Sequence, residues 1–320
     1  MLLLGATLHA ADSATADAGE YRGLCDASAA IAVPGGSMLV ASDEDNVLRL
    51  YDPRNPGPPI ASYDLGPGLE LTGRSPETDI EACATVGDRV FWITSHGRNA
   101  KGKERPNRGR LFATRTSTVG GRVVVEVDGS PYVTLLADLI GSPALSRFRL
   151  DRAAEKRPKD KGGLNIEGLA ATATGGLLIG FRNPIPQKQA LVVPLLNPSE
   201  LPSGGSARLG EPLLLDLGGL GIRDLVWIGH HYLILAGSAQ GGGSHRLYSW
   251  AGPGADAQFM SVVMPPESTP EALVALPGAD GDRLMLLSDD GTRLIGDCEC
   301  KKLKNPLERR FRAWWLVIGS

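Results

Sequence analysis

The sequence lacks the short motifs of several large enzyme classes. It contains no Gly-x-Ser-x-Gly turn, no His-Glu-x-x-His pair and no Gly-x-x-x-x-Gly-Lys-Ser/Thr loop. These motifs supply a serine nucleophile, two zinc-binding histidines and a phosphate-binding loop, respectively. The usual serine-hydrolase, zinc-protease and P-loop templates are therefore excluded. Ser95 and His96 are adjacent, but neighbouring strand residues face opposite sides, which argues against a nucleophile and base there.

The sequence also has little excess charge, few aromatic residues and no long apolar run. Its formal net charge is −3, its pI is about 6.0, and aromatic residues make up 5% of it. A slightly acidic chain with few side chains for base stacking is not typical of a nucleic-acid-binding protein. No run approaches the ~20 apolar residues of a membrane span. We therefore expect no nucleic-acid partner and no membrane span, and we expect a monomer.

Cysteine is scarce, and its spacing is not that of a zinc finger or a disulfide-dense domain. The four cysteines are Cys25, Cys83, Cys298 and Cys300. Cys25 and Cys83 lie beside equivalent acidic motifs, so an oxidising compartment could link them. The alternative is two buried free thiols. Cys298 and Cys300 are either a terminal staple or a loop pair, and the sequence leaves their oxidation state open.

The N-terminus resembles the end of a secretory signal. Residues 1–11 form an apolar stretch that runs into small residues, although a positively charged start is absent. We interpret this segment as the remnant of a signal peptide, with a flexible apolar tail as the alternative. The expected location is periplasmic or extracellular.

Glycine and proline are plentiful, with 41 and 23 residues among 320, which indicates many tight turns between short strands. Five times, an acidic motif precedes an alternating apolar stretch, a Gly-rich turn and a second strand. This repeat predicts an all-β fold, a single β-propeller with five blades counted directly. One interval, from Glu81 to Glu167, spans 86 residues and leaves a sixth blade open.

We assign residues 20–320 to this one propeller domain, with a charged insertion near residues 132–164. Leu135, Leu136, Leu139 and Ile140 in this interval follow a helical stripe, which favours an insertion over a degenerate blade. Residues 20–24 are expected to pair with the last blade, because sealing the ring removes open sheet edges.

The motif carboxylates are predicted to converge on the channel axis at one mouth. They are Asp26, Glu81, Glu167, Asp224 and Glu271. Converging carboxylates repel unless they are protonated, paired with Arg or bridged by a cation. A hard, oxygen-liganded cation such as Ca²⁺ is the simplest bridge. The alternative is that the carboxylates accept backbone hydrogen bonds and stabilise the ring without an ion.

The ends of the second strands should crowd the same mouth, because each forms an antiparallel hairpin with its first strand. As candidate catalytic residues, these ends contribute His96, Arg98 and Arg182. Histidine suits proton transfer near neutral pH, and arginine suits binding of negative charge. The candidate ligand-binding residues, some of them from adjoining segments, are Asp43, Asp45, Lys103, Asn183, Arg223 and Asp289.

Several short motifs, taken together, resemble an uncharacterised, usually exported bacterial family with a domain of unknown function. They read Asp-Ile-Glu at 79–81, Ser-His-Gly-Arg-Asn at 95–99, Asn-Ile-Glu-Gly-Leu at 165–169, Gly-Phe-Arg-Asn-Pro at 180–184 and Gly-Ile-Arg-Asp at 221–224. The resemblance implies a propeller and no known reaction. A looser similarity to phytase-like and esterase-like propellers rests on Glu167-Gly168-Leu169 and suggests calcium and phosphate esters.

Three functional hypotheses follow. The first is an exported propeller that binds a divalent cation and a small anionic ligand, as a metal-dependent phosphoesterase in its enzymatic form. In that form Glu81, Glu167 and Asp224 hold the metal, His96 moves a proton, and Arg98 and Arg182 neutralise charge. The second is a non-catalytic scaffold for a protein or an envelope component. The third is a lactonase-like hydrolase.

Overall fold

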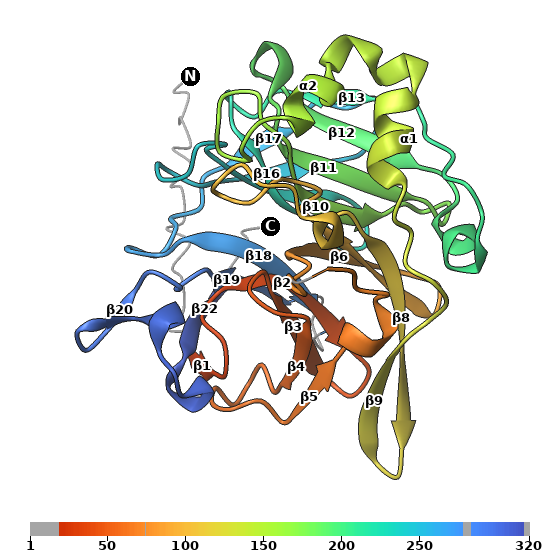
Figure 1. Ribbon diagram of the computed structural model, residues 1–320. Helices are drawn as coiled ribbons and strands as arrows, with labels where there is room; N and C mark the ends of the chain where they lie inside the picture. The colour runs from red at the N-terminus through yellow and green to blue at the C-terminus, as the bar shows by residue number, and fades with distance from the viewer. Residues whose placement is uncertain (1–18, 74, 278–282, 317–320) are drawn as a thin grey trace, which may run out of the picture.

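The computed structural model describes residues 19–73, 75–277 and 283–316, and it shows a five-bladed β-propeller (Figure 1). Each blade is a four-stranded antiparallel sheet. Blade one contains β2 (Ala27–Val33), β3 (Ser37–Ser42), β4 (Val47–Tyr51) and β5 (Ala61–Asp64). Blade two contains β6 (Ile80–Val86), β7 (Arg89–Thr94), β8 (Leu111–Val119) and β9 (Arg122–Val127).

The remaining blades follow the same order, with the innermost strand first. Blade three contains β10 (Asn165–Ala171), β11 (Leu177–Asn183), β12 (Ala190–Leu195) and β13 (Leu213–Leu215). Blade four contains β14 (Gly221–Trp227), β15 (Tyr232–Gly237), β16 (Arg246–Trp250) and β17 (Gln258–Met260). Blade five contains β18 (Pro270–Leu276), β19 (Arg283–Ser288), β22 (Arg310–Leu316) and β1 (Glu20–Arg22). The predicted five-bladed fold is thus confirmed.

The ring is closed by pairing the two ends of the described chain. Strand β1 pairs with β22, so the first strand completes the last blade, as the sequence predicts. Tyr21 is fully buried and stacks on Phe311 with ring centroids 5.1 Å apart. Glu20 adds ion pairs to Arg310 and Arg293 at 2.9 and 3.1 Å. These contacts cover sheet edges that would otherwise be open.

The apolar side chains gather between neighbouring blades. One buried cluster joins blades one and two and contains Leu39 and Trp92, and another joins blades two and three and contains Phe91 and Phe181. Further clusters lie between blades three and four, four and five, and five and one. Both faces of the blades therefore carry buried side chains, and strands such as β7, β11 and β15 are buried at consecutive positions along most of their length.

Two short helices lie between β9 and β10, inside the long interval of the sequence. They are α1 (Leu135–Gly141) and α2 (Leu150–Ala154), and α1 carries the predicted helical stripe. Leu135, Leu139 and Leu150 are buried in the cluster between blades two and three. In Figure 1 both helices lie against blade three, and the β8–β9 and β20–β21 hairpins project from the body. The interval thus adds a helical cap to the core of two blades.

Short elements lie in the connections between strands, within blades as well as between them. The strands β20 (Leu294–Ile295) and β21 (Cys298–Glu299) form a small hairpin. The 3-10 turns are η1 (Gly66–Gly68), η2 (Pro106–Arg108), η3 (Pro143–Phe148), η4 (Pro186–Lys188), η5 (Pro198–Ser203), η6 (Cys300–Lys302) and η7 (Pro306–Glu308). In the described part of the chain, every helix is too short or too polar to cross a bilayer.

The disulfide differs from the expected pairing. Cys25 is bonded to Cys300, 275 residues away, with 5.9 Å between the Cα atoms, while Cys83 and Cys298 are free. The link therefore joins the start of blade one to the loop after β21 in blade five and not to blade two. Of the two alternatives for these residues, the link between Cys25 and Cys83 does not form and the free thiol holds for Cys83 alone, because blade closure brings the C-terminal segment next to Cys25. The predicted signal remnant, residues 1–11, lies outside the described residues.

Candidate functional site

A β-bulge interrupts the innermost strand of every blade at the same place. At this point the register with the second strand skips one residue. The five skipped residues are Ser28, Glu81, Glu167, Arg223 and Glu271. A bulge leaves its extra residue outside the regular pairing and redirects the side chain. These five residues are thus the structurally equivalent positions around the channel.

This register corrects two members of the predicted carboxylate ring. Ser28 replaces Asp26 as the equivalent residue in blade one, and Arg223 replaces Asp224 in blade four. The ring therefore holds three carboxylates, one serine and one arginine. A bulge moves alternate residues by one position, and the sequence pattern did not reveal where each one lies.

Arginines pair with the carboxylates of blades three and five. Arg223 Nη1 lies 3.2 Å from Glu167 Oε2, and its other terminal nitrogen contacts the carboxylate of Glu271. Arg182 Nη1 donates to Glu167 Oε1 at 2.7 Å. Arg182, Glu167 and Arg223 are all at least 95% buried. Pairing with arginine is thus how this ring avoids much of the repulsion between its carboxylates.

Asp224 has a structural role instead. Its carboxylate accepts hydrogen bonds from the backbone N–H groups of Leu225 and Leu273, both at 2.7 Å, and so ties blade four to blade five. Ser28 makes a comparable tie by donating to the carbonyl of Ile80 at 2.6 Å. Asp224 also faces a different cavity, of about 220 Å³, that is lined mainly by apolar residues of the inner strands. For Asp224, the alternative prediction of a carboxylate that accepts backbone hydrogen bonds therefore holds. These contacts do not support its predicted metal-binding role.

A polar pocket of about 440 Å³ opens at the other end of the ring. Ligand pockets of small molecules have volumes of a few hundred Å³. Its acidic lining includes four of the predicted metal-binding residues, Asp26, Glu81, Glu167 and Glu271, and the predicted ligand-binding residues Asp43 and Asp289. Its basic lining consists of Arg108, Arg157, Lys159 and Arg182. The structure thus brings most of the predicted acidic residues into one pocket.

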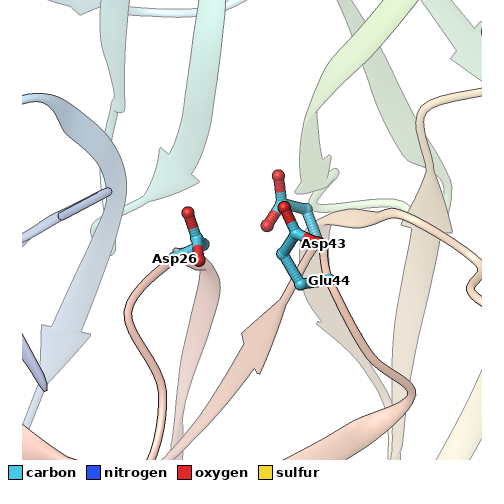
Figure 2. A group of neighbouring side chains, drawn as sticks. All are labelled: Asp26, Asp43 and Glu44. Carbon is cyan, nitrogen blue, oxygen red and sulfur yellow. The ribbon is translucent and has the colours of Figure 1, made fainter. Parts of the chain in front are cut away.

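Three carboxylates of this pocket lie close enough together to share a cation. One carboxylate oxygen each of Asp26, Asp43 and Glu44 lies within 4.8 Å of the others. Figure 2 shows Asp26, just before β2, facing Asp43 and Glu44, which lie in the loop after β3. Oxygen ligands of this kind suit a hard cation such as Ca²⁺ or Mg²⁺. The group shares only Asp26 with the predicted metal set.

The environment of this acidic group disfavours negative charge. Burial and the neighbouring Asp289 raise the pKa of Asp26 to about 8, and burial together with Asp26 raises the pKa of Asp43 well above its usual range. Asp43 Oδ1 is buried, and no described residue forms a hydrogen bond with it. A buried acceptor without a partner is uncommon in native proteins. A cation beside Asp43 would supply the missing partner.

Two further buried carboxyls line the pocket on the side of blade two. Burial, with Glu167 and Asp79 nearby, raises the pKa of Glu81 well above its ordinary value. Burial also raises the pKa of Asp79 to about 7, although Arg108 pairs with it at 2.8 Å and opposes the shift. A carboxyl that keeps its proton near neutral pH is able to act as an acid.

The predicted catalytic residues do not all reach the pocket. Arg182 lines it, whereas His96 and Arg98 are absent from its described lining. His96 is buried, its Nδ1 bonds the carbonyl of Thr94 at 2.7 Å, and burial lowers its pKa to about 4. Arg98 donates to the carbonyl of Ala154 at 2.9 Å and pairs with Glu104. Arg98 therefore lies beside the insertion, and both residues lie outside the described lining of the polar pocket.

The other predicted ligand-binding residues also have structural partners. Asp45 pairs with Arg49 at 2.6 Å, and the backbone N–H of Lys103 bonds the side chain of Asn99. Asn183 donates from Nδ2 to the carbonyls of Pro158 and Asp160, and Arg223 forms the ion pairs described above. None of these four belongs to the described lining of the polar pocket.

Sequence reasoning missed Glu44, Asn165, Arg157 and Lys159, all of which line the pocket. Glu44 follows Asp43 directly, so its position at the end of a second strand could have identified it as well. Asn165 is 5% exposed, and its Oδ1 has no hydrogen-bond partner within the described ranges. Arg157 and Lys159 belong to the charged insertion, and no local pattern shows that this segment returns to the channel mouth.

The fold resembles several solved structures of low sequence identity. The GH43 β-1,3-galactosidase BT3683 with galactodeoxynojirimycin is 10% identical, with a TM-score of 0.55 over 95% of this chain and 96% of that chain. The exo-β-1,3-galactanase of Phanerochaete chrysosporium is 7% identical, with a TM-score of 0.53 over 96% of this chain and 64% of that one. Glutaminyl cyclase from Myxococcus xanthus is 13% identical, with a TM-score of 0.49 over 96% and 97%. At these identities the likeness concerns the fold alone.

Sequence comparison gives a family resemblance without an activity. No curated protein matches the chain. A family model described as "Protein of unknown function (DUF3616)" matches residues 132–289, a range that includes the motifs at 165–169, 180–184 and 221–224. The predicted resemblance to an uncharacterised family is thereby confirmed, and over residues 132–289 this propeller is similar to DUF3616 proteins.

Proposed function

We propose that the polar pocket binds a divalent cation, with Ca²⁺ as the preferred ion, together with a small anionic ligand. The observation that carries this proposal is the distribution of charge across one 440 Å³ pocket. Asp26, Asp43, Glu44 and Asp289 come from blades one and five, whereas Arg157, Lys159 and Arg182 come from the insertion and blade three. Blade three is opposite blades one and five in a five-bladed ring, so these cations face these carboxylates across the pocket. Asp160 and Glu167 lie on the cationic side, paired with Arg157 and Arg182.

The acidic side offers a cation more than a cluster of surface carboxylates would. The buried Asp43 Oδ1, which lines this pocket, has no protein donor in the described chain. Carbonyl and carboxylate oxygens are the ligands that Ca²⁺ uses at 2.3–2.6 Å. A cation at Asp26, Asp43 and Glu44 would relieve the repulsion among these groups.

In its enzymatic form, the site would hydrolyse phosphate esters. A divalent cation bound there would supply Lewis-acid polarisation of a phosphoryl oxygen and lower the pKa of a bound water. Arg182 and Lys159 would bind the phosphoryl oxygens and stabilise negative charge that develops on them. Asp79 or Glu81, whose pKa values are raised, would hold the proton needed by the leaving oxygen.

The experiment is metal analysis of the purified protein by mass spectrometry, with melting curves in CaCl₂ and in EDTA. We expect a bound divalent ion whose removal lowers the melting temperature, and we expect Asp43→Asn to abolish both effects. Glu211→Gln, at an exposed site, is the matched control. A metal-free protein that responds to neither addition would contradict the proposal and favour the non-catalytic scaffold.

Glycoside hydrolysis is a second candidate, and Glu81 is the observation that favours it. A buried carboxyl with a raised pKa is the usual general acid of a glycosidase, with a second carboxylate in the same pocket. Two solved structures of similar fold are named as a β-1,3-galactosidase and an exo-β-1,3-galactanase. A panel of aryl phosphates, aryl galactosides and sugar lactones would separate this candidate, the phosphoesterase and the lactonase-like alternative.

An exported location completes the proposal. The disulfide between Cys25 and Cys300 supports it, because such bonds persist mainly in oxidising compartments. Fractionation of the native host, with thiol labelling of each fraction, would test it. Recovery of the protein in the cytoplasm with four free thiols would contradict an exported location.

A further inference from the structure

The insertion contributes a fixed segment to the rim of the polar pocket. Residues 157–160 line the pocket although they lie in the irregular chain between α2 and β10. The side chain of Asn183, 1% exposed at the end of β11, donates from Nδ2 to the carbonyl of Pro158 at 2.7 Å and to that of Asp160 at 2.8 Å. One buried amide thus holds two carbonyls on either side of Lys159.

Close packing limits movement of this segment further. A Cβ atom at Gly163 would lie 2.1 Å from the carbonyl oxygen of Arg157, so the chain passes itself closely at this turn. Gly97 makes a similar approach, since a Cβ there would lie 3.2 Å from Pro158 Cγ. The rim is therefore built into the fold between blades two and three.

Lys159 is the cation that this arrangement leaves available. Arg157 is paired with Asp160 at 2.8 Å, whereas Lys159 is exposed and has no ion pair within the described residues. Lys159 Nζ and Arg182 Nη2 lie 3.8 and 3.7 Å from the point where a Cβ of Gly241 would be. Both cationic groups therefore approach the same spot at the edge of the pocket.

We infer that Lys159 and Arg182 form an anion-binding subsite, and that Asn183 positions Lys159 in it. The ligand group it would take is a small oxyanion, a phosphate or a carboxylate, at the end of the ligand that faces the insertion. The inference rests on the proposed function, because that function supplies the anionic ligand. Ammonium and guanidinium groups bind such oxyanions by charge-assisted hydrogen bonds. Asn183 acts through Lys159 and is a positioning residue.

The test is calorimetric titration with methylphosphonate and with acetate, in the presence of CaCl₂, of the intact protein and its variants. Methylphosphonate stands for a phosphate group that cannot be hydrolysed, and acetate stands for a carboxylate. We expect Lys159→Ala to weaken binding of the preferred anion about tenfold, the loss of one charge-assisted contact. Lys159→Arg should restore most of this affinity.

Asn183→Ala should weaken binding of the same anion by a similar factor. The double variant should bind no more weakly than either single one, because both changes remove the same contact. Calcium affinity should stay unchanged in all of these variants, and an unchanged value also shows that each variant is folded. Lys156→Ala, in the same insertion but outside the described pocket lining, is the matched control.

The outcomes separate this inference from the proposed function. If the wild type binds an anion and Lys159→Ala binds it equally well, the subsite is overturned while the proposed function stands. If Lys159→Ala weakens binding but Asn183→Ala adds a further, independent loss, the positioning role is overturned. If the wild type binds calcium but neither anion, both the anionic ligand and this subsite are overturned.

Discussion

Arg223 Nη1 lies 3.2 Å from Glu167 Oε2, and this ion pair joins the innermost strand of blade four to that of blade three. Both side chains are more than 95% buried. Glu167 also accepts a hydrogen bond from Arg182, so one carboxylate neutralises parts of two guanidinium groups. Glu167 therefore stabilises the packing of the inner strands around the channel, independently of any ligand.

Replacing Glu167 with Gln should lower stability by about 3 kcal/mol, because it leaves two buried guanidinium groups without their shared carboxylate. Chemical denaturation of the purified variant measures this. Glu200→Gln is the control, since its ion pair with Arg208 is exposed and such pairs contribute little. A loss below 1 kcal/mol for Glu167→Gln would show that the arginines find other partners.

Removing the disulfide should destabilise the closed ring. Cys25→Ser together with Cys300→Ser opens a link across 275 residues, and loss of a native disulfide lowers stability by roughly 2–5 kcal/mol. Because Cys25 precedes Asp26, calcium affinity should fall as well. Thermal melts and calcium titration check both effects, with Cys298→Ser as the control. Equal melting temperatures for the double variant and the control would contradict the expectation.

His96 should make the protein less stable in acid. Its pKa is lowered by burial from 6.5 to about 4, so the stability it contributes is present above pH 6.5 and is lost as pH falls through 4. The loss at pH 4 should be about 3 kcal/mol. His96→Asn should lack this component, and asparagine tolerates the left-handed backbone at φ 56°. Denaturation at pH 7, 5.5 and 4 tests this; parallel pH curves for both proteins would refute it.

Gly291 should be needed for the acidic group of the pocket. A Cβ atom at this position would lie 1.7 Å from Asp26 Oδ1, so Gly291→Ala must displace the carboxylate. We expect calcium affinity to fall at least tenfold while the fold is kept. Gly141→Ala, at a site with no atom within 4 Å of the added Cβ, is the control. Calcium affinity is measured by calorimetry, and an unchanged value would remove Asp26 from the cation site.

The blades and their closure were largely predictable from the sequence. The alternation of apolar residues, the Gly-rich turns and the helical stripe of α1 are local signals, and they correspond to the observed elements. Burial of apolar side chains against neighbouring blades fixes such patterns, so they persist in the sequence. The pairing of β1 with β22 followed from the need to cover the open edges of the first and last blades.

The ring and the pocket were predictable only in part. The approximate place of the carboxylates was clear, but the bulges decide that Ser28 and Arg223, and not Asp26 and Asp224, occupy equivalent positions. A bulge changes the facing of a side chain through one extra residue, and nothing in the apolar pattern marks it. His96 was a plausible candidate from its neighbours in sequence, yet it is buried against the Thr94 carbonyl and is absent from the described pocket lining.

The sequence by itself determined the propeller architecture and the gathering of acidic residues at one mouth of its channel, because both follow from the period of the apolar residues and the direction of hairpins. The number of blades, five and not six, was decided by the structure, which places two short helices in the long interval. Tertiary structure alone decided which groups meet. Cys25 bonds Cys300, Arg223 pairs with Glu167 and Glu271, and Lys159 returns from the insertion to the pocket. Each of these contacts joins segments far apart in the chain, so it depends on the closed ring and on no local pattern.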